Sequence, residues 1–326
     1  MQLAHVTCAR HNLSFAERRM IAILPSRVIS EMAQRRHRFH HYLWHRMRNT
    51  WLRLREDERQ AVRHINNSWE PPRPARDGNG RPIRNNDSGE DFLFMHRQMI
   101  TRVNEILSGV GDPNYPRAEG WKRVPAPGDA DYPVPDFPGS GLEGVKSAEY
   151  FEQFITPWER QYTNPDYLRA VTLGQLGSDI EFTIHNDMHM RWAAPSSVGY
   201  RPTTSITQAI AEQWDATAYN YLGDTYSSHV NPVFWKLHGW VDDRIEDWRL
   251  ANGVTTEIAW KGTWVGPADH KHYEPRHAAD ADSTAVGIQT APADAGEELQ
   301  QIDQIISASG ASDFDGFFRP ATHPRP

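Results

Sequence analysis

Six histidines of this chain form one pattern that occurs twice: a pair spaced four residues apart, followed about fifty residues later by a third histidine in aromatic sequence. The first copy is His41, His45 and His96, and the second copy is His185, His189 and His238. Four residues are just over one helical turn, so both imidazoles of a pair project from the same face of a helix. Three imidazoles without sulfur or carboxylate suit copper, and two such sets predict a pair of copper ions.

Other metal chemistries need residues that the chain does not have at these places. A zinc protease helix carries a glutamate directly after its first histidine, where this chain has Tyr42 and Asn186. A di-iron bundle needs two Glu-x-x-His motifs, and the one such spacing, Glu274 to His277, contains a proline. Zinc or cobalt in a three-histidine site remains an alternative.

Composition and charge narrow the class of protein. The 326 residues carry a net charge of -7 and a mean hydropathy of -0.70, which argues against a nucleic-acid partner and against a membrane protein. Cys8 is the single cysteine, so a disulfide scaffold is excluded, and the first residues lack the pattern of a signal peptide. We therefore expect a cytoplasmic location. The basic segment 35–63 is interpreted as a solvated helix face.

The spacing of apolar residues predicts a mainly α fold with long irregular loops. Proline and glycine mark the loops, at 70–90 and 111–141. Helices are expected at 56–65, 91–108, 147–155, 164–176, 203–221 and 231–250, and in the region that carries His41 and His45. Residues 1–264 are predicted to form the helical domain, and 265–326 an acidic, partly irregular C-terminal tail that packs on or over it.

Four short segments surround the six histidines: HHYLWH at 40–45, GEDFLFMHRQMITR at 89–102, IHNDMH at 184–189 and NPVFWKLHGWVDDR at 231–244. The first two resemble the first copper site of arthropod hemocyanins and prophenoloxidases. The last two are similar to the opening and the close of the second copper site of tyrosinases and hemocyanins. The chain thus resembles the type 3 copper proteins over about residues 36–250. The resemblance implies a four-helix bundle that houses a dicopper centre.

The resemblance also implies the ligands, with alternatives in the first site. One copper ion would be held by His41, His45 and His96, and the other by His185, His189 and His238. A His37/His41 pair has the same spacing, and His64 is a candidate if the first site is built as in tyrosinases. Tyrosinases usually place a ligand nine residues before the third histidine. That position is Asp87 here, which favours the hemocyanin-like pairing.

The family's chemistry would use the copper pair and dioxygen to oxidise, or to ortho-hydroxylate, a phenol, a catechol or an o-aminophenol. The alternatives are a hemocyanin-like protein that binds dioxygen without turnover, a single-metal or catalytically silent relative, and a zinc hydrolase. A copper metallochaperone that loads the site is a candidate partner, and the sequence does not reveal whether the protein uses one.

Asn186, directly after the first ligand of the second site, is the candidate catalytic residue. Similar tyrosinases use an asparagine there, with a nearby glutamate, to position a water that takes a proton from the phenol. The usual place of that glutamate is Gly177 in this chain. Glu181, Asp187 and Asp224 are its possible substitutes, in no order of preference.

Two further features carry weaker expectations. His229, nine residues before His238, is expected in a surface loop, with the substrate entrance as the alternative. Phe314, Phe317 and Phe318 are expected to dock the tail on the domain. Some relatives instead block the copper pair with an aromatic side chain.

Overall fold

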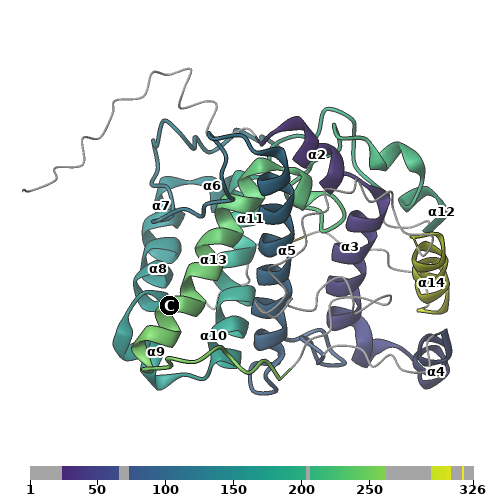
Figure 1. Cartoon of the computed structure of the whole chain (residues 1–326), viewed down its shortest axis with the longest axis horizontal. Coiled ribbons are helices and arrows are strands. Elements are labelled where there is room, and N and C mark those ends of the chain that lie inside the picture. Colours follow the sequence, from purple (N-terminus) through teal and green to yellow (C-terminus); the bar gives the residue numbers. More distant parts are fainter. Residues whose placement is uncertain (1–23, 66–72, 203–205, 262–294, 310–317, 319–326) are drawn as a thin grey trace, which may run out of the picture.

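The computed structural model describes residues 24–65, 73–202, 206–261, 295–309 and 318, and it is mainly helical (Figure 1). The longer helices are α2 (Ser26–Met32), α3 (Arg35–Thr50), α4 (Glu56–Ile65), α5 (Ser88–Val110), α8 (Thr156–Tyr162), α10 (Leu173–Ile180), α11 (Asn186–Trp192), α13 (Pro232–Ala251) and α14 (Ala295–Ala308). The short ones are η1 (Trp51–Arg53), α6 (Glu143–Lys146), α7 (Ala148–Tyr150), η2 (Phe151–Ile155), α9 (Pro165–Ala170), η3 (Glu181–His185), α12 (Ile206–Ala209), η4 (Glu212–Asp215) and η5 (Ser228–Val230). In the part described, one isolated bridge, Arg76 to Pro82, is the whole of the β-structure.

The predicted mainly α class is confirmed, as are the helices at 56–65 and 231–250. The amide oxygen of Asn231 accepts a hydrogen bond from the Val233 backbone at 3.0 Å and so caps α13, with Pro232 in the first turn. Residues 111–142 contain no helix, as the glycines and prolines there predict. None of the helices that can be described is long and apolar enough to cross a membrane.

The helix expected at 203–221 is wrong, because only α12 and η4 are helical in its described part. A buried guanidinium explains the difference. Arg38 of α3 donates hydrogen bonds to the carbonyl oxygens of Ala216, at 2.8 Å, and of Tyr219, at 3.0 Å. A continuous helix to residue 221 would use the Ala216 oxygen for its own hydrogen bonds, so the arginine stabilises an irregular course that a local sequence pattern does not contain.

The basic segment 35–63 is not simply a solvated face, which corrects the expectation. Arg38 and Arg48 are completely buried in α3. Arg48 forms an ion pair with Glu181 of η3, with nitrogen–oxygen distances of 2.5 and 3.0 Å, and donates to the Ser88 carbonyl of α5 at 2.6 Å. Buried charges require such partners, and this one connects three of the segments that carry the histidines.

Helices α5 and α10 approach each other through glycine. A Cβ atom on Gly89 would lie 2.0 Å from the Ser178 backbone nitrogen, and one on Gly177 would lie 2.0 Å from the Gly89 carbonyl oxygen. No side chain fits at this contact. Gly177 therefore cannot be replaced by the glutamate that tyrosinases carry at the corresponding place, and the close backbones bring the helix of His96 near η3 and α11.

Helix α14 packs against α3 and α4, with Ile305 and Ile306 fully buried (Figure 1). The division of the chain after residue 264 stays a prediction, since 262–294 lie outside the described residues.

Candidate metal centre

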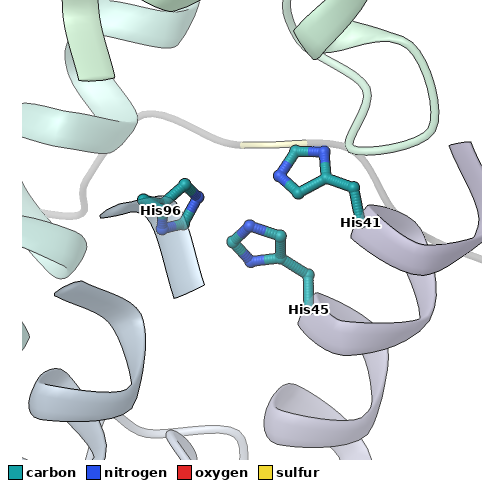
Figure 2. Close-up of side chains that lie close together, drawn as sticks. All are labelled: His41, His45 and His96. Carbon is teal, nitrogen blue, oxygen red and sulfur yellow. The ribbon is translucent and has the colours of Figure 1, made fainter. Parts of the chain in front are cut away.

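Four helical segments bring the six predicted histidines together in the interior. Helix α3 supplies two, α5 supplies one, the consecutive segments η3 and α11 supply two, and α13 supplies one. Their exposed fractions lie between 0% and 4%. Figure 2 shows the rings of His41 and His45 on α3 facing His96 on α5.

Ligand atoms gather in two overlapping groups around His96. The possible ligand nitrogens of His41, His45 and His96 lie within 4.8 Å of one another, and so do those of His96, His185 and His238. The Nε2 atoms of His189 and His238 are 3.2 Å apart. Two nitrogens that bind one ion tetrahedrally at about 2.0 Å lie about 3.3 Å apart, so this pair fits a shared metal.

Hydrogen bonds fix which ring nitrogen is available at two of these positions. The Nδ1–H group of His96 donates to the Phe92 carbonyl, and that of His189 to the Leu222 carbonyl, both at 2.8 Å. Each bond leaves Nε2 free to bind a metal.

Of the six predicted ligands, four have a buried Nε2 atom without a hydrogen-bond partner in the described structure: His41, His45, His96 and His185. An unsatisfied buried polar atom costs about 1–3 kcal/mol, so four in one place need an explanation. Metal ions coordinated by these nitrogens would supply it, and the residues present therefore fit a metal centre.

Burial lowers the pKa of these imidazoles, because a charged ring would lose its hydration, and at every position except His189 neighbouring histidines lower the pKa further. The pKa of both His41 and His189 falls to about 3. The pKa values of His45, His96, His185 and His238 are also held well below 6.5. The rings are thus neutral near pH 7, the form in which histidine binds metals.

Aromatic rings line the centre. Phe92 lies 4.5 Å from His96 and Phe234 lies 3.9 Å from His238, measured between ring centroids. The Phe318 ring stacks on His189 at 4.0 Å, and its backbone nitrogen donates to the Gly223 carbonyl at 2.7 Å. Phe318 also lies 5.5 Å from His45 and from His185, so one tail residue touches both histidine sets. Phe314 and Phe317 lie outside the described residues.

His229 is fully buried, so the expected surface-loop position is wrong. Its Nε2–H group donates to the Met32 carbonyl at 3.0 Å, and its Nδ1 lies 3.2 Å from Nδ1 of His41. In that tautomer Nδ1 of His229 accepts a hydrogen bond from the Nδ1–H group of His41. The Nε2 atom of His41 is then free to bind a metal. A histidine that orients another histidine in this way has no local sequence pattern, because the contact joins residues 188 positions apart.

The structure does not bring the alternative first-site residues to His96. His64 is exposed on α4. His37 is partly exposed and belongs to neither group of possible ligands found in the described part of the chain.

Asn186 is partly exposed, and its amide oxygen lies 3.3 Å from Nδ1 of His185, which places it beside the ligand ring. The three acidic candidates all have partners. Glu181 pairs with Arg48, Asp187 accepts from the Tyr150 hydroxyl at 2.6 Å, and Asp224 accepts from Arg201 at 2.9 and 3.0 Å. Each of the three carboxylates therefore already takes part in an ion pair or a hydrogen bond with another side chain.

No protein-family model matches the chain, and no curated protein shows significant similarity to it. A proposal about function therefore rests on the site.

Proposed function

We propose that this chain is a copper-dependent oxidoreductase of the type 3 copper class, which uses dioxygen to oxidise a phenol, a catechol or an o-aminophenol. Two copper ions are its cofactors, one held by His41, His45 and His96 and the other by His185, His189 and His238, within a bundle of the four histidine-bearing helical segments. The observation that carries the proposal is the cluster of unpartnered Nε2 atoms in a buried pocket without carboxylate ligands. Imidazole binds copper in both of its common oxidation states.

The copper pair, when bound, supplies the activation of dioxygen. The protein holds six neutral imidazoles, two of them, His96 and His189, in tautomers fixed by carbonyl groups, and surrounds them with Phe92, Phe234 and Phe318, which exclude water. Because Asn186 contacts His185, we assign it the orientation of that ring and of a water beside it. Hydroxylation of a monophenol requires a proton acceptor. Since the nearby carboxylates are engaged, oxidation of a diphenol is favoured over hydroxylation.

Phe318 favours a second candidate, a protein that binds dioxygen without turnover. Its ring occupies the space against His189, His45 and His185 that a flat aromatic substrate would need. Dioxygen is smaller and needs less of that space.

The test is reconstitution of the purified protein with copper, followed by three measurements: metal content, the near-ultraviolet band that appears on adding hydrogen peroxide, and dioxygen consumption with catechol and o-aminophenol. The proposal expects two copper ions per chain, the band, and quinone formation. His96→Ala and His238→Ala should both abolish the band, whereas the exposed control His64→Ala should retain it.

The other outcomes separate the alternatives. The band without oxidation of either substrate would replace the oxidase by a dioxygen carrier. One copper per chain would indicate a single-metal relative. Retention of the full band by His96→Ala would refute the ligand assignment, and a hydrolytic activity with zinc alone would refute the copper proposal.

A further inference from the structure

A small cavity with a different set of potential metal ligands lies next to the six-histidine centre. A partly open cavity of about 20 Å³ is lined by residues of α2, α3, α5, η5 and α13, and it has room for one water-sized occupant. Its lining residues include three methionines, Met32, Met95 and Met99, together with His37 and His40. Three of the chain's eight methionines thus meet at one small cavity.

We propose that this cavity is a copper(I) site through which copper reaches the centre, an inference that rests on the proposed function. Its donors are the thioether sulfurs of Met32, Met95 and Met99, with imidazole from His37 or His40. Soft sulfur ligands select copper(I), whereas Mg²⁺, Ca²⁺ and Mn²⁺ prefer the oxygen ligands that this wall lacks among its side chains. No electron transfer is involved, because the ion enters and leaves as copper(I).

The lining residues of the cavity differ in exposure, which distinguishes an outer end from an inner end. His37 and Met99 are partly exposed, whereas Met32 and Met95 are each only 3% exposed. The inner wall includes His41, a proposed ligand of the copper pair. An ion that enters past His37 and Met99 therefore meets an imidazole of the centre at the inner end.

The helical spacing arranges the donors along that direction. Met95 and Met99 are four residues apart on α5, so this helix presents an outer and an inner sulfur donor, and on α3 the donor His37 lies one turn from His41 of the six-histidine centre. Methionine has three flexible side-chain torsions and can close on an ion of small radius. Rotation of these side chains can thus move a copper(I) ion from the outer to the inner ligands, without a movement of the helices.

The remaining polar groups of the wall are compatible with a cation. Arg102 forms an ion pair with Glu105 at 3.1 Å, which offsets its charge. Both ring nitrogens of His229 are engaged, one with Met32 and one with His41, so we assign His229 a positioning role and not that of a donor.

The test uses the full-length metal-free protein and copper(I) buffered by a chelator of known affinity under anaerobic conditions. X-ray absorption at the copper edge after addition of less than one equivalent should show a sulfur shell at about 2.3 Å, typical of metal–sulfur bonds. The Met32→Leu/Met95→Leu/Met99→Leu variant keeps the side-chain volumes nearly constant. It should lose the sulfur shell and weaken binding of the first copper(I) ion by about 10–100-fold.

Two further variants keep the result interpretable. Met47→Leu changes a fully buried methionine of α3 outside the cavity wall and should leave the sulfur shell intact. Met99→Leu alone changes a partly exposed residue, so it serves if the triple variant does not fold, and it should reduce the sulfur amplitude.

The outcomes distinguish this inference from the proposed function. Two copper ions bound only by nitrogen, with unchanged loading in the triple variant, would overturn the cavity site and leave the oxidase proposal standing. A sulfur-bound ion that never fills the six-histidine centre would uphold a copper(I) site, overturn its role in loading, and count against the oxidase. A sulfur shell that persists in the triple variant would refute the assignment of donors.

Discussion

Acid should destabilise the metal-free protein steeply, because its buried histidines cannot take up protons in the folded state. Burial holds the pKa of His41 and His189 at about 3, and it keeps the pKa values of the other four proposed ligands and of His229 well below 6.5. In the unfolded chain each of these residues titrates near its ordinary pKa of about 6.5.

The sign and size of the effect follow from proton linkage. Below pH 6.5 the unfolded chain binds protons that the folded chain does not, so the free energy of unfolding falls as the pH falls. Between pH 7.5 and 5.5 each such histidine removes about 1.4 kcal/mol. Seven would remove at most about 10 kcal/mol, which is comparable with the whole stability of a typical domain, about 5–15 kcal/mol.

The assay is urea unfolding of chelator-treated protein at pH 7.5, 6.5 and 5.5, followed by circular dichroism. The slope of stability against pH gives the number of protons taken up on unfolding. Replacing one buried ring, in His238→Leu, should lower that number by about half a proton, averaged between pH 7.5 and 5.5, whereas His64→Ala, at an exposed position, should leave the uptake of the buried set unchanged. Bound copper should move the acid transition to lower pH, since it binds the deprotonated rings of the folded state.

Constant stability between pH 7.5 and 5.5 would refute this reasoning, because it would mean that the folded protein protonates these rings as readily as the unfolded chain does. The unpartnered Nε2 atoms would then not be the buried, neutral ligands that the proposed function requires.

Three further variants test contacts around the centre. Gly89→Ala should lower the free energy of unfolding in urea by at least about 1–3 kcal/mol, because the new methyl group meets the α10 backbone. Gly109→Ala, with open space around it on the same helix, should not lower it. Equal stabilities of the two variants would refute the close contact. Asp224→Ala leaves the Arg201 guanidinium buried without its ion-pair partner and should cost about 3–5 kcal/mol by the same measurement; a loss below 1 kcal/mol would show that water reaches the pair. Phe318→Ala removes the ring stacked on His189 and should raise kcat/KM for catechol by up to about tenfold, the equivalent of one aromatic contact; an unchanged value in the copper-loaded protein would show that Phe318 does not limit access.

The helical class and the six clustered histidines could be predicted from the sequence because both depend on local spacing. A pair four residues apart has a fixed geometry on a helix, and a proline after an asparagine marks the start of α13. That His96 belongs with the other five was suggested only by its aromatic surroundings and by the family resemblance. How the six rings divide between two ions is not a local property, and in the structure His96 is close to members of both sets.

The sequence could not predict the residues that act across long separations. His229 stands in a polar stretch that resembles an exposed loop, and only the folded chain places it between Met32 and His41. The basic segment has the composition of a solvated helix, yet Arg38 and Arg48 are buried because each has a partner more than 130 residues away, Tyr219 for the first and Glu181 for the second. Helix propensity likewise favours a helix at 203–221. In the structure the carbonyl oxygens of Ala216 and Tyr219 instead accept hydrogen bonds from the Arg38 guanidinium.

That irregular stretch connects with both halves of the centre. The Leu222 carbonyl fixes the tautomer of His189, and His229, a few residues further on, orients His41. Arg38 holds the preceding turn through its hydrogen bonds to Ala216 and Tyr219. A helix through this segment would remove the hydrogen bonds to His189 and to His41, so the loop orients two of the proposed ligands even though it supplies none itself.

The variant Arg38→Met tests this connection, because it keeps an apolar stem and removes every donated hydrogen bond. It should weaken copper binding by about 10–100-fold without changing a ligand. A general loss of stability could produce a similar result, so the control is Val62→Ala, which opens space at a fully buried position of α4 away from the loop. If both variants lose stability but only Arg38→Met loses copper affinity, the loop orients the ligands. Equal losses of affinity would show that the site responds to overall stability alone, and the role assigned to the loop would be wrong.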